Sequence, residues 1–399
     1  MKKGKIIALI MTTFLCTSSS TMVFAMDNIE NNSREIGNKE ETKVITILGK
    51  DNKEELNLNI DEVMQKVEKD NMELKLMDGK ITLLNRLYDR DLTLSQSIDN
   101  DRDISINYNN VSFRKQLMLN FRQSALNVKS ARKDREDKTK EIKRELERNY
   151  LNVLNCRRDI KNTEDTLKNL DMQIEKLQRY IEQGKASPTS IEPLKVQKSQ
   201  LKSSLNLPKL QEQESLLKIK QYLGLDQTKD IKLNLEYANK KFELYSPEDI
   251  DKIINDSIEN NFGLYKMKEG LDFLKVERQI YEKYGRNTEV ESTNTDIRIR
   301  DTENSIEDYK LNLRVNFWSA YYNLKEKEDE VNVAKVNLEY SKMKYEEIKY
   351  RFDQGLQDKV QLESAKLDFE KKKIEEEKAV NEYMITVQSF KDTLEIVIQ

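Results

Sequence analysis

The residues that usually end helices are almost missing from a long stretch of this chain. No glycine lies between Lys80 and Gln183, and the first proline is Pro188. The 399 residues include only 10 glycines and 4 prolines, where average usage would give roughly 28 and 20. Folds with many short elements need a turn bearing glycine or proline every few residues. The scarcity therefore predicts an all-α protein of long helices and excludes most sandwiches, barrels and α/β domains.

The composition disfavours catalysis and nucleic-acid binding. The chain contains no histidine, which removes Ser-His-Asp and Cys-His nucleophile systems and every histidine-ligated metal site. Its 69 basic and 72 acidic residues give a net charge of −3, whereas nucleic acid calls for a basic face. We therefore expect a protein that is not an enzyme and that has no cofactor, no metal site and no nucleic-acid partner.

The N-terminal segment, 1–25, has the pattern of a signal peptide. Three lysines close to the N-terminus precede an apolar run over residues 6–16. Val23 and Ala25 then supply residues small enough for cleavage before Met26. No later apolar run approaches the about 18 residues of a membrane helix. We expect an exported chain, with a retained N-terminal anchor as the alternative.

The chain matches itself, which indicates two copies of one unit. At an offset of 171, residues 179–184 align with residues 350–355, and Leu223 aligns with Leu394. Earlier segments pair at an offset of 190. The predicted organisation is a signal peptide at 1–25, a polar arm at 26–58, a first repeat at 59–224, a connector at 225–247 and a second repeat at 248–399.

Apolar residues inside each repeat recur in steps of four and three, the spacing of a coiled coil. The two copies keep one seam, which we define by its positions. In the first copy it consists of Ile142, Leu146, Asn149, Val153, Cys156, Ile160, Thr163, Leu167, Leu170, Ile174, Leu177 and Ile181; in the second, of Leu313, Phe317, Ala320, Leu324, Lys327, Val331, Ala334, Leu338, Ser341, Tyr345, Ile348 and Phe352. Its place in the seam predicts that Cys156 is a small buried residue and not a reactive thiol. The charges between seam positions are interpreted as solvated helix faces.

The helix lengths fit together as antiparallel hairpins. A helix over 112–183 would be roughly 108 Å long, and Gly184 would end it before a return helix to residue 224. A half-length helix over 60–90 precedes it. The second copy repeats this scheme at 249–284, 288–354 and 357–397. In the first return helix, Pro208 predicts a kink or a split.

This double repeat resembles the TolC-like outer-membrane efflux family, over residues 58–398. The most specific segment is the run Tyr350-Arg351-Phe352-Asp353-Gln354-Gly355-Leu356. Its partner is weaker, because Lys185 stands where the family usually has an apolar residue. The resemblance implies a homotrimer that forms a hollow α-helical tube, whose tips at 183–187 and 354–357 meet an adaptor protein tied to a plasma-membrane pump. The implied docking residues are Gln183, Gly184, Lys185, Gln354, Gly355 and Leu356. The alternative is that these turns only end helices.

Two features depart from the family pattern. The family closes its tube with a network of a tyrosine, an arginine and aspartates, but the equivalent positions here are Phe352, Gln357, Gln361 and Ser364. Any closure must then come from packing or other groups. The family also inserts strands into a membrane barrel, and the candidate hairpins at 92–110 and 285–300 are short and polar. We expect β-barrel strands that are absent or vestigial, as in an envelope without an outer membrane.

The resulting hypothesis is a conduit component of an efflux or secretion system at the cell envelope or cell surface. It would dock an adaptor and help to move small molecules or peptides out of the cell. The alternative is a structural coiled-coil protein of the cell surface that transports nothing.

Overall fold

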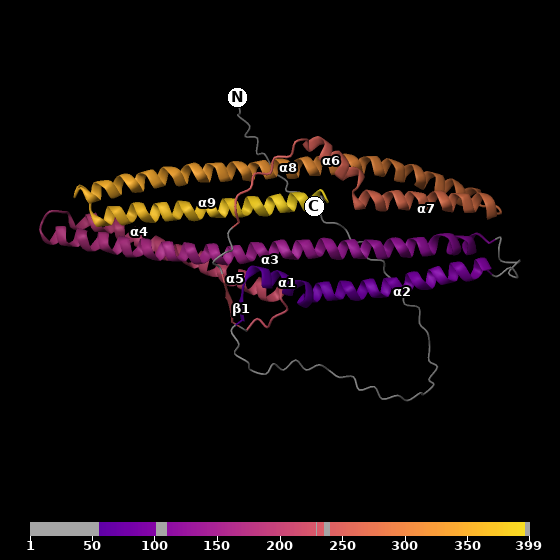
Figure 1. Ribbon diagram of the computed structural model, residues 1–399, viewed down its shortest axis with the longest axis horizontal. Coiled ribbons are helices and arrows are strands. Elements are labelled where there is room, and N and C mark those ends of the chain that lie inside the picture. Colours follow the sequence, from indigo (N-terminus) through magenta and orange to yellow (C-terminus); the bar gives the residue numbers. More distant parts are fainter. Residues whose placement is uncertain (1–55, 101–109, 229, 235–239, 396–399) are drawn as a thin grey trace, which may run out of the picture. The chain divides into compact units, whose positions relative to one another are not determined.

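The computed structural model describes residues 56–100, 110–228, 230–234 and 240–395, all of which belong to one of the chain's two units, Lys53–Gln399. The predicted signal peptide and nearly all of the polar arm lie outside the described residues. The elements, shown in Figure 1, are β1 (Leu56–Leu58), α1 (Ile60–Asp70), α2 (Met72–Asn100), α3 (Val111–Glu182), the 3-10 helix η1 (Pro188–Ile191), α4 (Glu192–Ser204), α5 (Asn206–Tyr222), β2 (Ile231–Leu233), α6 (Ile250–Glu259), α7 (Phe262–Tyr284), α8 (Glu289–Asp353) and α9 (Lys359–Thr393).

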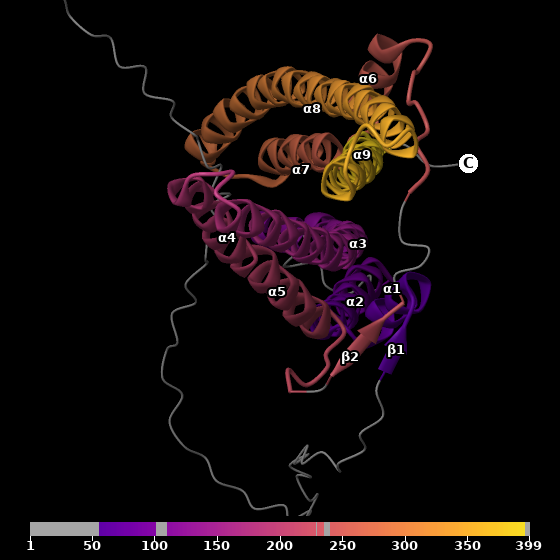
Figure 2. The ribbon, with the colours of Figure 1, turned by 90° about the vertical axis from the view of Figure 1, so that its left-hand side faces the viewer.

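The helices of this unit pack side by side, and the two long helices, α8 and α3, lie on either side of α7 and α9. Helix α8 packs on α7 and α9, these two pack on α3, and α3 packs on α2, α5 and α4. Both views show the same succession from α8 to α5 (Figures 1 and 2). Each long helix therefore lies beside shorter helices placed one after another, as the lengths predicted. The fold is all-α, with long antiparallel helical hairpins.

Helix α3 is 72 residues long, as the absence of glycine and proline predicted. Its N-cap is Asn110, whose side chain accepts a hydrogen bond from the backbone N–H of Ser112 at 2.8 Å. Such a cap satisfies one of the free N–H groups in the first turn. The helix ends at Glu182, and Gln183 is its C-cap, directly before Gly184.

The predicted seam is the buried face of both long helices. None of its positions is exposed. Leu146 and Val153 of α3 are fully buried in one apolar cluster, and Leu324 and Val331 of α8 are fully buried in another. Cys156 is buried, and burial raises the pKa of its thiol, so the prediction of a small buried residue is confirmed.

The half-length helices differ from the prediction, because an asparagine interrupts each of them. Helix α1 ends at Asp70 and α2 begins at Met72; α6 and α7 are likewise separate. The side-chain oxygens of Asn71 and Asn261 each accept a hydrogen bond at 3.1 Å from the backbone N–H three residues later. Asparagine competes with the backbone for hydrogen bonds and starts a new helix.

Most of the described residues of the two candidate hairpin segments are helical, in line with the expectation that strands there are absent or vestigial. Helix α2 continues to Asn100, and α8 begins at Glu289. Ser124 of α3 donates a hydrogen bond to Asp91 at 2.5 Å, and the Ser95 hydroxyl donates one to the Leu117 carbonyl at 3.0 Å. These contacts hold this part of α2 against α3 as a helix. Residues 101–109 lie outside the described residues.

The predicted interruption near Pro208 is confirmed. Helix α4 ends at Ser204 and α5 begins at Asn206. Pro208 therefore lies in the first turn of α5, where the missing N–H costs no intrahelical hydrogen bond.

The connector touches both halves of the unit. Strand β2 pairs in parallel with β1. Further on, the backbone N–H of Lys240 donates to the side chain of Asn381 in α9 at 2.8 Å, and its ammonium lies 2.7 Å from Glu147 of α3. The Tyr245 N–H donates to the Tyr383 hydroxyl at 2.9 Å. Over the described part of the chain, no helix combines the length and apolar content needed to cross a membrane.

Candidate partner-docking turns

Two turns with the same backbone geometry reverse the chain at the ends of α3 and α8. Gly184 has φ 68° and Gly355 has φ 71°, a left-handed conformation that costs glycine little. The Lys185 N–H donates to the Tyr180 carbonyl and the Leu356 N–H to the Arg351 carbonyl, both at 2.8 Å. These are Schellman closures, which satisfy carbonyls that a helix end leaves free.

The six predicted docking residues are all exposed, and each turn brings three of them together. A Cβ added to Gly184 or Gly355 would meet no atom within 4 Å. Beside Gly355, the Leu356 side chain is 75% exposed. The turns thus offer open backbone and, at the second turn, one apolar side chain to a partner. A partner helix could approach closely there, and its groove could take Leu356.

The four positions equivalent to the family's closing network hold no ion pair, because all four side chains are uncharged. Phe352 and Gln357 are half-buried, whereas Gln361 and Ser364 are exposed. Gln361 instead starts helix α9. Its backbone N–H donates to Asp358 at 2.8 Å, and its side chain accepts from the Asp358 N–H at 3.4 Å. This reciprocal pair is a capping box.

Sequence reasoning missed the charge contact next to this cap. Lys176 of α3 forms an ion pair with Asp358 at the start of α9. The Lys176 ammonium, as a hydrogen-bond donor, holds the pKa of the Asp358 carboxyl below its usual range. Lys176 and Asp358 are 182 residues apart, so no local motif in the sequence could have paired them.

Two substitutions at Asp358 should separate its two roles. Asp358→Asn keeps a good N-cap and removes the charge, so we expect a loss of at most about 1 kcal/mol in unfolding free energy. Asp358→Ala also removes the cap and should cost about 1 kcal/mol more. Urea unfolding followed by circular dichroism measures both. Equal losses for the two variants would show that the cap does not stabilise the second turn.

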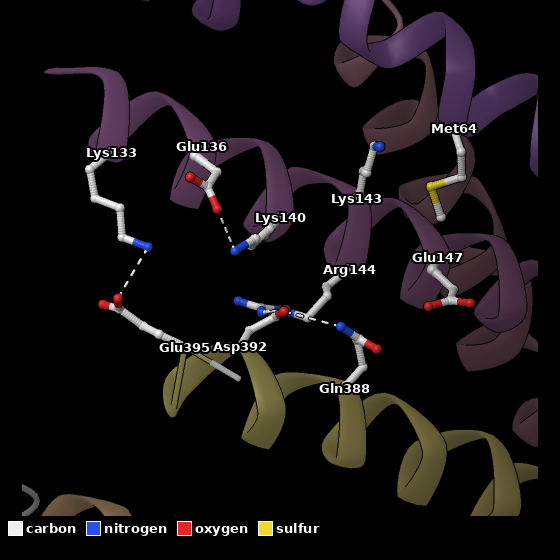
Figure 3. A pocket seen from close by; sticks show the side chains of 10 residues that line it. All are labelled: Met64, Lys133, Glu136, Lys140, Lys143, Arg144, Glu147, Gln388, Asp392 and Glu395. Carbon is white, nitrogen blue, oxygen red and sulfur yellow. Dashed lines mark hydrogen bonds and ion pairs between the residues drawn. The ribbon is translucent and has the colours of Figure 1, made fainter. Parts of the chain in front are cut away.

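A cavity of about 580 Å³ between α1, α3 and α9 is the other candidate site (Figure 3). Basic side chains in its lining are matched by carboxylates. Lys140 lies 2.7 Å from Glu136, Lys133 lies 3.5 Å from Glu395, and Arg144 pairs with Asp392. These pairs leave their cations compensated, which disfavours an anionic ligand. The cavity is therefore interpreted as a joint between helices, with Met64 in its lining.

Several charged residues that were expected to lie on solvated helix faces instead form ion pairs between the two halves of the unit. Three further ion pairs connect α3 with α9: Arg148 with Glu382, Arg158 with Glu377, and Lys378 with Asp159. The Asn162 side-chain amide of α3 also donates a hydrogen bond to the Leu367 carbonyl of α9. Other charges do form pairs within one helix turn, such as Lys133 with Asp137. Among the described residues, no group of carboxylates and cysteines is arranged to hold a metal ion.

No family model and no individual curated protein matches this chain. Several solved structures have a similar fold. The outer-membrane channel OprN is 11% identical with a TM-score of 0.59, covering 84% of this chain and 89% of its own. The CmeC outer-membrane channel of Campylobacter jejuni is 12% identical with a TM-score of 0.56, covering 84% and 85%. The MtrE outer-membrane channel of Neisseria gonorrhoeae is 9% identical with a TM-score of 0.59, covering 84% and 88%.

These similarities establish the fold. The chain has a TolC-like helical architecture, as the resemblance in its sequence implied. The three similar structures are outer-membrane channels.

Proposed function

We propose that this chain, which shares its fold with outer-membrane channels, is the conduit component of an export system in the cell envelope. The signal peptide at 1–25 would direct its export. The repeats at 59–224 and 248–399, joined by the connector at 225–247, would form one segment of the wall. Three copies would enclose a passage for small molecules or peptides. The observation that carries the proposal is a channel-like helix arrangement that ends in two exposed glycine turns.

Exposed apolar residues support assembly from several copies. The outer face of α2 carries four apolar side chains at coiled-coil spacing, each between 43% and 68% exposed: Met72, Leu76, Leu83 and Leu87. A row of this kind on a helix marks an interaction surface. A single copy leaves it in water, whereas a neighbouring helix would bury it.

The turns would receive the partner that connects the conduit to an energy source. In this proposal the turns at 183–185 and 354–356 contact the helical hairpin of an adaptor protein, which is bound in turn to a plasma-membrane pump. Their exposure and the open space around both glycines support this role. The ion pair between Lys176 and Asp358 would keep the second turn in place.

Electron microscopy combined with an export measurement tests the proposal. The purified chain should form hollow cylinders of about 100 Å, the length of α3 at the α-helical rise. Deletion in the source cell should raise the retention of exported dyes or peptides, and the intact chain should restore export. Thin rods together with unchanged export would overturn the proposal and favour a structural coiled-coil protein.

A further inference from the structure

Helix α8 carries a second row of apolar residues that no described element covers. Its members recur every seven residues and are each between 56% and 67% exposed: Val315, Tyr322, Val336, Met343 and Tyr350. Asp329 occupies the missing place in the row. Seven-residue spacing is the pattern by which one helix packs along another. We call this row the α8 stripe.

Helices α4 and α5 carry a matching row. Val196, Leu210 and Leu217 are between 46% and 56% exposed, and Ser203 fills the place between the first two. We call this row the α5 stripe. The two stripes lie on helices at opposite ends of the order α8, α9, α3, α5 (Figure 2). One copy thus has two separate apolar edges.

The interface between α3 and α9 inside one copy indicates which surface can pack against each apolar edge. At the sequence offset of 171, α3 corresponds to α8 and α9 corresponds to the return helices α4 and α5. Arg144 and Arg158 of α3 contact α9. Their counterparts at this offset are Val315 and Asp329 of the α8 stripe.

The same correspondence holds for α9. Its residue Leu367 contacts α3, and the counterpart of Leu367 at the same offset is Val196 of the α5 stripe. Each edge of the unit therefore presents one half of an interface that the unit already contains. Each edge therefore fits the opposite edge of another copy of this chain, so that the α8 stripe of one copy meets the α5 stripe of the next in a heterologous interface.

The internal interface also gives the register. Between α3 and α9, the residue numbers of touching partners add to between 529, for Asn162 with Leu367, and 537, for Asp159 with Lys378. Moving to the corresponding helices adds 171 to one number and subtracts 171 from the other, so the total is kept. Three apolar pairs then fall together, each with a total of 532: Val336 with Val196, Tyr322 with Leu210, and Val315 with Leu217.

The place of the one polar residue in each row favours this register over those shifted by seven residues. Residues 326–330 of α8 hold four carboxylates and one lysine, while α4 and α5 hold six lysines and three glutamates. At a total of 532, Asp329 lies opposite Ser203 and beside Lys202. Both Asp329 and Lys202 are exposed, and neither has an ion-pair partner within the described part of the chain. A slip of seven residues would leave a lysine, Lys209 or Lys195, beside Asp329 but would place its carboxylate opposite the apolar side chain of Leu210 or Val196 instead of the polar Ser203.

We propose that α8 of one copy packs antiparallel against α4 and α5 of the next copy, with Val336 beside Val196, Tyr322 beside Leu210 and Asp329 beside Lys202. This rests on the proposed function, since a conduit wall needs copies that join edge to edge. It adds the pairing of residues that decides how the copies meet.

Cysteine pairing tests the register directly. In a full-length background with Cys16 and Cys156 replaced by Ala, a chain carrying Val196→Cys is mixed with one carrying Val336→Cys and oxidised. A disulfide needs Cα atoms about 4.4–6.8 Å apart, and one heptad spans about 10 Å. We expect a covalent dimer from this mixture and none when Met343→Cys replaces Val336→Cys. Each single variant alone is the control for random oxidation.

The outcomes separate this inference from the proposed function. A dimer only with Met343→Cys would overturn the register. No dimer from either mixture, with chains still associated in sedimentation, would overturn the interface and leave the conduit proposal standing. Chains that stay monomeric at tens of micromolar would contradict both.

A charge exchange gives a second test that does not depend on oxidation. Asp329→Lys should weaken self-association by about tenfold or more, because it places like charges together. Adding Lys202→Glu should restore it. Both residues are exposed, so monomer folding should not change, as circular dichroism can check. A double variant as weak as Asp329→Lys alone would contradict the assigned contact.

Discussion

Replacing Leu356 by aspartate should weaken adaptor docking by about tenfold or more while helicity and unfolding midpoint stay unchanged. Leu356 is 75% exposed, so the isolated chain gains little stability from it. Burying a leucine side chain in a partner is worth about 1.5–3 kcal/mol, and every 1.4 kcal/mol changes Kd by about tenfold. A carboxylate in the same groove would also lose its hydration.

The equivalent residue of the first turn provides the matched control. Lys185 is the counterpart of Leu356 at the offset of 171 and has the same backbone hydrogen bond. Because Lys185 offers no apolar group of similar shape, Lys185→Asp should weaken docking less. Binding of each variant to surface-immobilised adaptor protein from the same cells gives its Kd, and circular dichroism checks its folding. If Leu356→Asp binds as well as the unchanged chain, the second turn does not contact the adaptor.

Replacing Leu324 by alanine should produce the largest loss of stability among single changes in α8, about 2–5 kcal/mol. Leu324 is fully buried in the cluster that joins α8 to α9 and contains Phe317 and Tyr383. Removing its side chain loses the transfer free energy and leaves a cavity that the two long helices cannot easily close.

Leu311 on the same helix is the control for this substitution. It is 59% exposed, so Leu311→Ala should change the unfolding free energy by no more than about 0.5 kcal/mol. Urea unfolding at dilute protein concentration, where self-association contributes little, measures both variants. Similar losses for both variants would mean that the seam of α8 is not its packed face.

The parts of the fold that depend on local pattern were predictable from the sequence. A run without glycine or proline predicted α3, and the four-and-three spacing of the seam predicted which face of α3 and α8 is buried. Gly184 and Gly355 marked the two turns because a left-handed residue ends a helix most easily as glycine.

The errors came from weaker local signals. Asn71 and Asn261 start new helices without glycine or proline, although their alignment at an offset of 190 was a usable sign. The short candidate hairpin that begins near Leu92 was expected to be absent or vestigial, and contacts from α3 to Asp91 and Ser95 hold this part of α2 as a helix.

Contacts between distant segments could not be read from the sequence. Arg144 and Asp392 are 248 residues apart, and each looked like one more charge on a solvated face. The capping role of Gln361 was missed because this residue aligns with a position of the family's closing network, which this chain does not keep.

The packing of α3 also has a consequence for how the chain reaches its folded state. One side of α3 is covered by α2 and α5 from its own half, but the other side is covered by α7 and α9. Helix α9 is the last helix of the described residues. Closing the long loop between α3 and α9 costs conformational entropy before the contacts between these helices contribute any stabilisation. During synthesis, α3 therefore remains half-covered until α9 has been made, and this interval is when the chain most needs protection from aggregation.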